Sequence, residues 1–396
     1  MSTLAEKAVT LTQDLIRCPS VTPKDAGALD VLASRLTEVG FRCDRLTFTD
    51  DDTPDIDNLV ARIGGGPAHL CFAGHTDVVP PGDEALWRHP PFAAEIASGV
   101  LYGRGASDMK GAIACFAAAA IDYATDRGGD IGGTISLLIT GDEEGPAING
   151  TKKVLQWMEQ EGLTPSHCIV GEPSNATTLG ETIKIGRRGS LSAHLTVLGQ
   201  QGHVAYPHLA ANPVKGIIAV LGSLYDTPLD DGSAHFSPSN LEVTSIDVNN
   251  PATNVIPASA EARLNIRFND LHGADALKAM LQDLVASTLS GTDLTFDLAF
   301  APPGDAFITK PGELDALVSE AVHETTGKTP SLSTNGGTSD ARFIKDYCPV
   351  VEFGLTTQSI HKTDENVKIA DLGQLTAIYR HFIARYFETF GGPDGR

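Results

Sequence analysis

The chain has 396 residues, enough for two or three domains with a large buried core, and 41% of them are hydrophobic. Its 50 acidic and 29 basic residues give a formal net charge of -21, which argues against a nucleic-acid partner. No apolar run reaches membrane-spanning length, and residues 1–21 lack the pattern of a signal peptide, so neither membrane insertion nor secretion is expected. Six cysteines without a CxxC pair fit a reduced, cytoplasmic compartment.

The first 185 residues alternate helix-like and strand-like segments, as the layers of α/β proteins do. Helical patterns occupy residues 6–17, 26–39 and 109–124, and extended apolar runs occupy residues 58–63, 69–73, 134–140 and 168–170. Short apolar runs bounded by glycine are typical of buried strands. We therefore expect a mostly parallel mixed sheet flanked by helices.

A different pattern occupies the middle of the chain, where apolar and polar residues alternate as in half-exposed strands. Strands at 190–198, 261–268 and 292–300 and helices at 213–225 and 274–288 fit the order strand, helix, strand, strand, helix, strand of a ferredoxin-like α+β unit. The α/β pattern then returns, with a helix at 313–326, a strand at 350–354 and a helix at 372–390. We expect a discontinuous catalytic domain, residues 1–185 and 299–396, and an inserted domain, residues 186–298.

Four apolar runs of the α/β part lead into a possible metal ligand. The ligands that follow them are His75, Glu143 with Glu144, Glu172 and His361. Parallel strands place their functional sites outside their carboxyl ends. The sequence therefore predicts that these side chains gather at one edge of the sheet.

Several candidate residues of the α/β part, including Asp77 and Asp108, have both a functional and an ordinary structural interpretation. Asp77 could orient the His75 imidazole, although a His-x-Asp triplet also occurs as a surface pair. Asp108 precedes a helical pattern, and its position suits both a helix N-cap and a carboxylate that bridges two metals. Glu143 and Glu144 point in different directions in an extended chain, so one could bind metal while the other faces substrate, but acidic turns are usually only solvated.

Five motifs in the same order resemble the di-zinc aminoacylase and carboxypeptidase superfamily. They are Gly74-His-Thr-Asp-Val-Val79, Gly103-Arg-Gly-Ala-Ser-Asp-Met-Lys-Gly111, Gly141-Asp-Glu-Glu-Gly145, Gly171-Glu-Pro173 and Ser359-Ile-His361. Further runs are similar to the branch of this superfamily that hydrolyses N-succinyl-LL-2,6-diaminopimelate in lysine biosynthesis. These are Ile185-Gly-Arg-Arg-Gly-Ser190, Gln201-Gly-His-Val-Ala-Tyr-Pro-His208, Asn254-Val-Ile-Pro257 and Gly336-Gly-Thr-Ser-Asp-Ala-Arg-Phe343.

The resemblance implies a zinc-exopeptidase-like fold and two zinc ions per subunit, with cobalt or manganese as substitutes. The implied ligands are His75 and Glu172 for one ion, Glu144 and His361 for the other, and Asp108 for both. Asp77 would support His75, and Glu143 would act as general base. The family also has a cis peptide after the bridging aspartate, here Asp108-Met109.

The inserted domain is implied to form a homodimer in which His203 and Asn254 act in the partner's site. Arg187, Arg267 and Thr338 match positions that contact substrate in the desuccinylase branch, and arginine pairs well with the carboxylates of that substrate. The chain departs from the branch at Thr357, where asparagine is usual. This puts one substrate contact in doubt.

Two other functions remain to be compared with this one. A sibling deacylase, such as an acetylornithine deacetylase, or a dipeptidase would use the same metal site. A non-catalytic metal-binding protein would keep the fold, but it would have no use for Glu143. A serine hydrolase is not expected, because the chain lacks the G-x-S-x-G turn.

Overall fold

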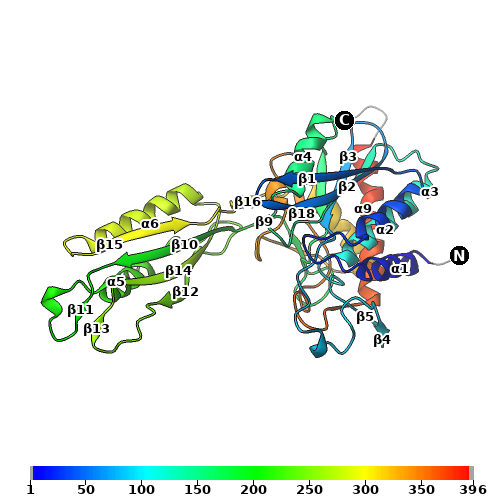
Figure 1. The fold of residues 1–396 in the computed structure, drawn as a ribbon. Helices are drawn as coiled ribbons and strands as arrows, with labels where there is room; N and C mark the ends of the chain where they lie inside the picture. The colour runs from blue at the N-terminus through cyan, green and yellow to red at the C-terminus, as the bar shows by residue number, and fades with distance from the viewer. Residues whose placement is uncertain (1–2, 392–396) are drawn as a thin grey trace. The chain divides into compact units, whose positions relative to one another are not determined.

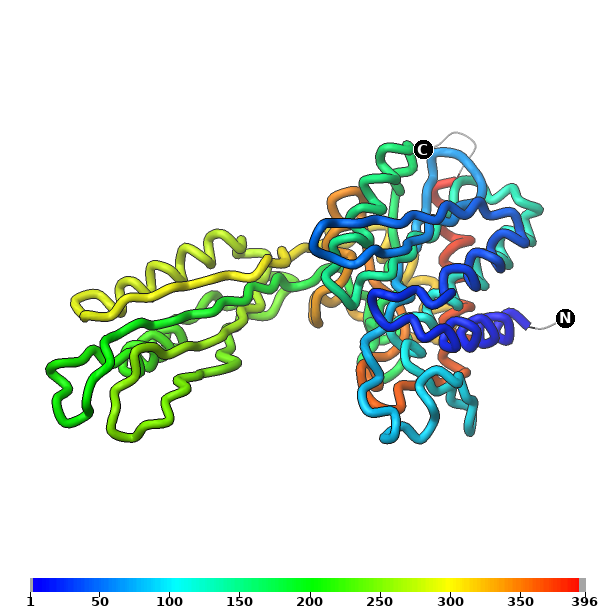
Figure 2. Tube along the Cα trace, viewed as in Figure 1, coloured from blue at the N-terminus to red at the C-terminus, as the bar shows by residue number. Residues whose placement is uncertain are grey.

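A computed structural model describes residues 3–391 of the chain (Figures 1 and 2). The chain divides into two compact units, and each is described by itself. Unit 1 contains the residues up to Ile185, Thr309–Ser333 and the residues from Ser339 onward, and unit 2 contains Gly186–Ile308 and Thr334–Thr338. Unit 2 extends past residue 298, the boundary expected from the sequence, because strand β16 (Phe307–Ile308) pairs with β9 (Gly186–Arg187).

The centre of unit 1 is a mixed sheet, which has eight strands within residues 3–391. Their order is β1 (Arg42–Asp50), β2 (Thr53–Gly64), β6 (Thr134–Thr140), β3 (His69–His75), β7 (His167–Val170), β18 (Val350–Glu352), β8 (Thr182–Lys184) and β17 (Ser331–Ser333). The four middle strands β6, β3, β7 and β18 are parallel to one another. Their side chains are almost all buried, as expected for parallel strands covered by helices.

Helices flank this sheet. They are α1 (Leu4–Ile16), α2 (Ala28–Thr37), α3 (Lys110–Asp126), α4 (Thr151–Gln160), α7 (Glu313–Thr326), α8 (Ala341–Ile344) and α9 (Ile369–Phe390). Helix α3 contacts both α1 and α9 and is buried over most of its surface, because its many alanines let neighbours approach from every side. Phe116 of α3 stacks on Phe72 of β3 with ring centroids 4.4 Å apart, which joins this helix to the sheet.

Smaller elements complete unit 1. Strands β19 (Asn366–Lys368), β5 (Val100–Tyr102) and β4 (Ile96–Ala97) form a separate sheet, and Glu84–Leu86 is a short 3-10 helix. Within residues 3–391, no helix has both the length and the apolar character needed to cross a membrane.

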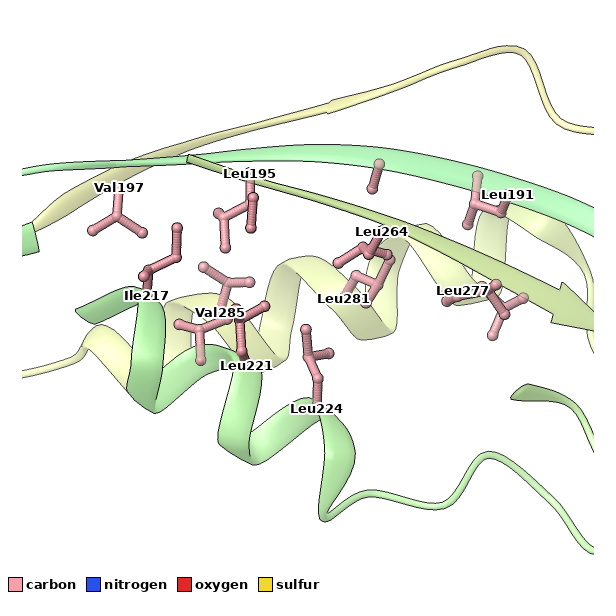
Figure 3. Close-up of a cluster of buried hydrophobic side chains, with 14 of the residues drawn as sticks. Leu191, Leu195, Val197, Ile217, Leu221, Leu224, Leu264, Leu277, Leu281 and Val285 are labelled. Carbon is pink, nitrogen blue, oxygen red and sulfur yellow. The ribbon is translucent and has the colours of Figure 1, made fainter. Parts of the chain in front are cut away.

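Unit 2 has an antiparallel sheet in the order β12 (Asn240–Asp247), β14 (Ser259–Phe268), β10 (Gly189–Leu198) and β15 (Thr295–Phe300). Helices α5 (Pro213–Tyr225) and α6 (Ala274–Leu289) pack on one face of this sheet (Figure 3). Leu195 and Val197 of β10 meet Ile217 and Leu221 of α5 in this core, while the intervening strand residues face away. Unit 2 also contains β11 (Gly202–His203), β13 (Val255–Ile256) and the 3-10 turn Pro207–Leu209.

The predicted fold class is confirmed: a mixed α/β sheet flanked by helices, with an inserted ferredoxin-like unit. The helix bounds expected at 213–225 and 313–326 match those of α5 and α7. Strand β1 was not predicted, because its side chains are half-exposed or exposed and mostly polar. Helix α4 was not predicted either, and it has no side-chain cap at its beginning.

Candidate metal centre

The candidate site is at the carboxyl edge of the four parallel strands of unit 1. His75 ends β3, Glu143 and Glu144 follow β6, Glu172 follows β7, and His361 lies in the loop after β18. Because these strands are parallel neighbours, their carboxyl ends meet at the same edge. The structure therefore brings together the residues whose convergence the strand pattern predicts.

Two histidines mark the two halves of the site. In the first half, His75 Nε2 is 3.4 Å from Asp108 Oδ1 and 3.4 Å from Glu172 Oε1. In the second half, His361 Nε2 is 2.8 Å from Glu144 Oε1 and 3.3 Å from Asp108 Oδ2. Asp108 thus directs one carboxylate oxygen toward each histidine, which is the geometry that a bridging ligand needs.

Asp108 does not cap the helix that follows it. Helix α3 begins at Lys110, its N-cap residue is Met109, and no side chain caps it. The peptide bond between Asp108 and Met109 is cis, as the family resemblance implies. The sequence leaves two interpretations open for Asp108, a helix N-cap and a carboxylate that bridges two metals. The structure excludes the N-cap.

Asp77 contacts His75 in a different way from the one expected. The Nδ1 atom of His75 is 2.9 Å from the backbone oxygen of Asp77, whereas the nearest carboxylate oxygen is 3.6 Å away. The Asp77 carboxylate instead accepts hydrogen bonds from the backbone N–H groups of Glu143 and Glu144, at 3.2 and 3.0 Å. One residue therefore fixes both the histidine ring and the turn that carries the two glutamates.

Glu143 lies next to the first half of the site. Its Oε2 atom is 3.9 Å from His75 Nε2, and its side chain is 13% exposed. Burial and the nearby Glu172 carboxylate raise the pKa of Glu143 well above its usual value. Burial alone would lower the pKa of His75, but the nearby carboxylates of Asp108 and Glu172 outweigh it and raise this pKa. The close packing of carboxyl groups thus creates a strong demand for positive charge.

The donor atoms fit divalent metal ions. His75 Nε2 and Asp108 Oδ1 are buried and have no hydrogen-bond partner within residues 3–391. Each of two groups of side chains, His75 with Asp108 and Glu144, and His75 with Glu143 and Glu172, offers ligand atoms within 4.8 Å of one another. Imidazole and carboxylate donors suit zinc and related ions, and a bound cation would satisfy the orphaned atoms.

The remaining predicted residues belong to unit 2. His203 of β11 and Asn254 are exposed neighbours, since β11 pairs with β13 and the N–H of Val204 donates to Asn254 O at 3.2 Å. Arg187 is 5% exposed, and its Nη1 donates to Gly337 O at 2.8 Å, next to the exposed Thr338.

Arg267 is the last of the predicted residues in unit 2. It lies on β14, where burial and the neighbouring Arg188 guanidinium lower its pKa. Two cations held this close to one another suit an anionic group such as a carboxylate.

Two buried residues beside the site were not predicted. Glu365 is fully buried and accepts backbone hydrogen bonds from Ser107 and Asp108, and it pairs with Arg104 at 2.7 Å. Arg104 lies inside the motif Gly103–Gly111, but a single sequence does not distinguish a buried charge from a solvated one. Glu365 lies in the run Lys362-Thr-Asp-Glu365, which has the composition of an exposed turn.

The chain is similar to known proteins in both sequence and fold. The model of peptidase family M20/M25/M40 matches residues 71–385. The chain is 58% identical over 381 residues to a succinyl-diaminopimelate desuccinylase of Rhodopseudomonas palustris (strain TIE-1), covering 96% of this chain and 98% of that protein. The fold is similar to that of the aminopeptidase PepT of Bacillus cereus, with a TM-score of 0.77, 18% identity, and 96% and 98% of the two chains covered. A dinuclear metal-binding M20 peptidase of Bacillus subtilis matches with a TM-score of 0.73 and 16% identity over 98% and 99% of the two chains.

Proposed function

Because the chain belongs to peptidase family M20/M25/M40, we propose that it is a metal-dependent amide hydrolase with two zinc ions in each subunit. It converts N-succinyl-LL-2,6-diaminopimelate and water to succinate and LL-2,6-diaminopimelate, a step of lysine biosynthesis. The observation that carries the proposal is Asp108, which directs its two oxygens toward His75 and His361. The identity of 58% to a protein named succinyl-diaminopimelate desuccinylase supports the choice of substrate.

The side chains of unit 1 divide into two ligand sets. His75 and Glu172 hold one zinc ion, Glu144 and His361 hold the other, and Asp108 contributes to both. Cobalt and manganese are substitutes, because such nitrogen and oxygen sites follow geometry and metal availability more than raw affinity. When bound, the ions would polarise the amide carbonyl and lower the pKa of a bound water to about 7.

Glu143 carries the proton. Its Oε2 atom is 3.9 Å from His75 Nε2, and its backbone N–H donates to the Asp77 carboxylate, so the Glu143 carboxylate lies beside the proposed ligands. Glu143 accepts a proton from the attacking water as the new C–O bond forms. It then returns this proton to the amide nitrogen as the C–N bond breaks, and succinate and the free amine are released.

Unit 2 supplies recognition and dimer contacts. Arg187, Arg267 and Thr338 bind the carboxylates and backbone of the substrate, because a guanidinium pairs with a carboxylate through two parallel hydrogen bonds. The partner subunit supplies His203, which donates to the developing oxyanion, and Asn254. The exposed side chains of Ile218, Tyr225 and Ile246 on α5 and β12 support a homodimer, and β12 lies at one edge of the sheet of unit 2.

The enzyme acts in the cytoplasm in this proposal. None of the six cysteines forms a disulfide, although four of them are buried and three of these belong to or precede neighbouring strands of the sheet. This use of cysteine fits a reducing compartment.

The test is hydrolysis by purified, zinc-loaded protein of N-succinyl-LL-2,6-diaminopimelate, N-acetylornithine and a panel of dipeptides, each with and without chelator. We expect chelator-sensitive turnover of the succinyl substrate alone, because the arginines require a carboxylate that an acetyl group lacks. Preference for N-acetylornithine or a dipeptide would keep the metal site and overturn the substrate. A metal-loaded protein that hydrolyses none of them would overturn the enzyme assignment.

A further inference from the structure

Glu365 occupies an unusual position for a carboxylate. It is completely buried, yet it lies in the loop that follows the proposed ligand His361. One carboxylate oxygen, Oε1, accepts hydrogen bonds from the backbone N–H groups of Ser107 and Asp108, both at 3.0 Å. The other oxygen, Oε2, accepts from Arg104 Nη1 at 2.7 Å. All three donors belong to the loop that carries Asp108.

Further hydrogen bonds join the same two loops. The N–H of Gly103 donates to the backbone oxygen of Glu365 at 2.9 Å, and Arg104 Nη1 also donates to Lys362 O at 3.3 Å. These contacts continue the pairing of β5 with β19, whose register ends at Tyr102 opposite Asn366. The hydrogen bonds of the Glu365 side chain therefore extend this strand pairing and hold the loop of Asp108 against the loop of His361.

We propose that Glu365 is a positioning residue of the metal centre, which fixes Asp108 relative to His361 so that both can bind the same ion. The inference rests on the proposed ligand set. Asp108 can serve two ions only if the direction of its carboxylate is fixed, and the backbone N–H of Asp108 is one of the groups that Glu365 holds. Residues that hydrogen-bond to a metal ligand, without binding the metal themselves, commonly contribute about 10–100-fold to metal affinity.

The other side of the centre has the same arrangement, which supports this reading. There the buried Asp77 carboxylate accepts from the backbone N–H groups of Glu143 and Glu144. Glu365 and Asp77 thus each accept hydrogen bonds from two successive backbone N–H groups of a loop that carries a proposed ligand. A repeated device at two of the ligand loops points to positioning of the ligands.

A carboxylate suits this position because its three hydrogen-bond partners, the N–H groups of Ser107 and Asp108 and the Arg104 guanidinium, are all donors. A glutamine at position 365 would present an oxygen on one side and an NH2 group on the other. If the oxygen faced Ser107 and Asp108, the NH2 group would face the Arg104 guanidinium, and the reverse orientation would set the NH2 group against the two N–H groups. Either orientation leaves buried donors unpaired, so Glu365→Gln should release one of the two loops.

The experiment compares metal binding by wild-type protein, Glu365→Gln and Glu365→Asp. Metal-free samples are titrated with Zn²⁺ by calorimetry, and the visible spectrum is recorded after addition of Co²⁺. We expect Glu365→Gln to bind the more weakly held ion about 10–100-fold less tightly and to change the Co²⁺ spectrum. Glu365→Asp keeps the charge opposite Arg104, so it remains folded even if Glu365→Gln does not, but its shorter side chain cannot reach both loops and should also weaken binding.

Asp230→Asn is the matched control in unit 2. The Asp230 side chain is 7% exposed and also accepts backbone hydrogen bonds, from Gly232 and Ser239, so the variant makes the same chemical change in another place. We expect it to lower thermal stability and to leave Zn²⁺ affinity and the Co²⁺ spectrum unchanged.

The outcomes separate this inference from the proposed function. Wild-type protein that binds no zinc would overturn both. Wild-type protein that binds two ions, together with a folded Glu365 variant of unchanged affinity and spectrum, would overturn only the role of Glu365. Equal loss of affinity in Asp230→Asn would also overturn it, because the effect would then be one of general stability.

Discussion

The two halves of the candidate metal centre are built differently. His75 ends a central strand, its side chain is 2% exposed, and its second ring nitrogen is fixed by the backbone oxygen of Asp77. His361 lies in a loop, has a φ of 58°, and its side chain is 48% exposed. The neighbouring strands β3 and β7 thus position His75 and Glu172 in the first half, whereas in the second half only Glu144 directly follows a strand and His361 depends on hydrogen bonds between loops. The sheet provides the enclosed half of the candidate site, and the loops provide an open half that solvent can reach.

The largest expected effect concerns Glu143, the proposed acid–base residue beside the enclosed half. Glu143→Gln keeps the shape of the side chain but removes its ability to take up a proton, so turnover should fall by about 10²–10⁴-fold. Metal content should be unchanged, because Glu143 is not a proposed ligand. Steady-state rates and metal analysis of the same sample test this. Turnover close to wild type at full metal content would remove Glu143 from the reaction.

Metal titration tests the comparison directly. His75 Nδ1 has a hydrogen-bond partner, the backbone oxygen of Asp77, whereas His361 Nδ1 has no such partner within residues 3–391. A hydrogen bond to the second ring nitrogen of a ligating histidine contributes about 10–100-fold to metal affinity. We therefore expect two Zn²⁺ binding steps that differ by about this factor. His361→Ala should abolish the weaker step, and His75→Ala should abolish the tighter one. Two equal steps in the wild-type protein would contradict the division into an enclosed half and an open half.

Strand β3, which ends at His75, begins at a second histidine whose protonation should make the stability of the fold depend on pH. His69 begins β3, its ring is 2.7 Å from the Ser136 hydroxyl, and burial lowers its pKa to about 4 from an ordinary 6.5. The unfolded chain therefore binds this proton at a higher pH than the folded one. The stabilisation that comes from a neutral His69 is complete above pH 6.5 and is lost as the pH falls toward 4, at a cost of about 3 kcal/mol.

Denaturant unfolding of metal-free protein between pH 7 and pH 4 measures this effect. His69→Asn removes the titrating group, so the free energy of unfolding should fall less steeply with pH than in the wild-type protein. His381→Asn is a suitable control, because His381 is an exposed histidine on α9. Identical pH profiles for wild type and His69→Asn would show that His69 does not carry the dependence.

The sequence predicts the enclosed half better than the open half. Buried parallel strands leave a clear apolar pattern, and the residue that follows such a strand has a predictable place at the edge of the sheet. The position of His361 depends on a loop whose contacts, such as that between Glu365 and Asp108, join residues far apart in the chain. No local pattern records such contacts, so the sequence pattern places His361 only somewhere after the strand at 350–354, and the family resemblance assigns it to one of the two proposed zinc ions.

The role of Asp77 shows the same limit on a smaller scale. Alternation along an extended chain predicts that its carboxylate faces His75, but the chain turns after β3 and the carboxylate receives backbone N–H groups from another loop. Backbone donors are invisible in a sequence pattern because every residue except proline has one. The sequence therefore indicates which side chains are present at the edge, and the fold decides which atoms they meet.

The smallest expected effect concerns Thr357 in the loop of the open half. Its backbone N–H donates to Asn175 O at 2.8 Å, and the neighbouring Thr356 forms a parallel bridge with Asn175. These contacts hold the loop whatever side chain stands at position 357, which is half-buried. Thr357→Asn should therefore change one substrate contact without moving His361. A single hydrogen bond contributes about 0.5–1.5 kcal/mol, so KM should change by about two- to tenfold.

Kinetics with the succinyl substrate, together with Zn²⁺ titration, test this last expectation, and Thr356→Asn serves as a matched control in the same loop. A change in KM for Thr357→Asn at unaltered zinc affinity would place the residue in substrate recognition. A change in zinc affinity would mean that the side chain supports the ligand loop itself. The geometry of the open half would then depend on a further loop side chain besides Glu365. The difference between the open half and the enclosed half would be larger.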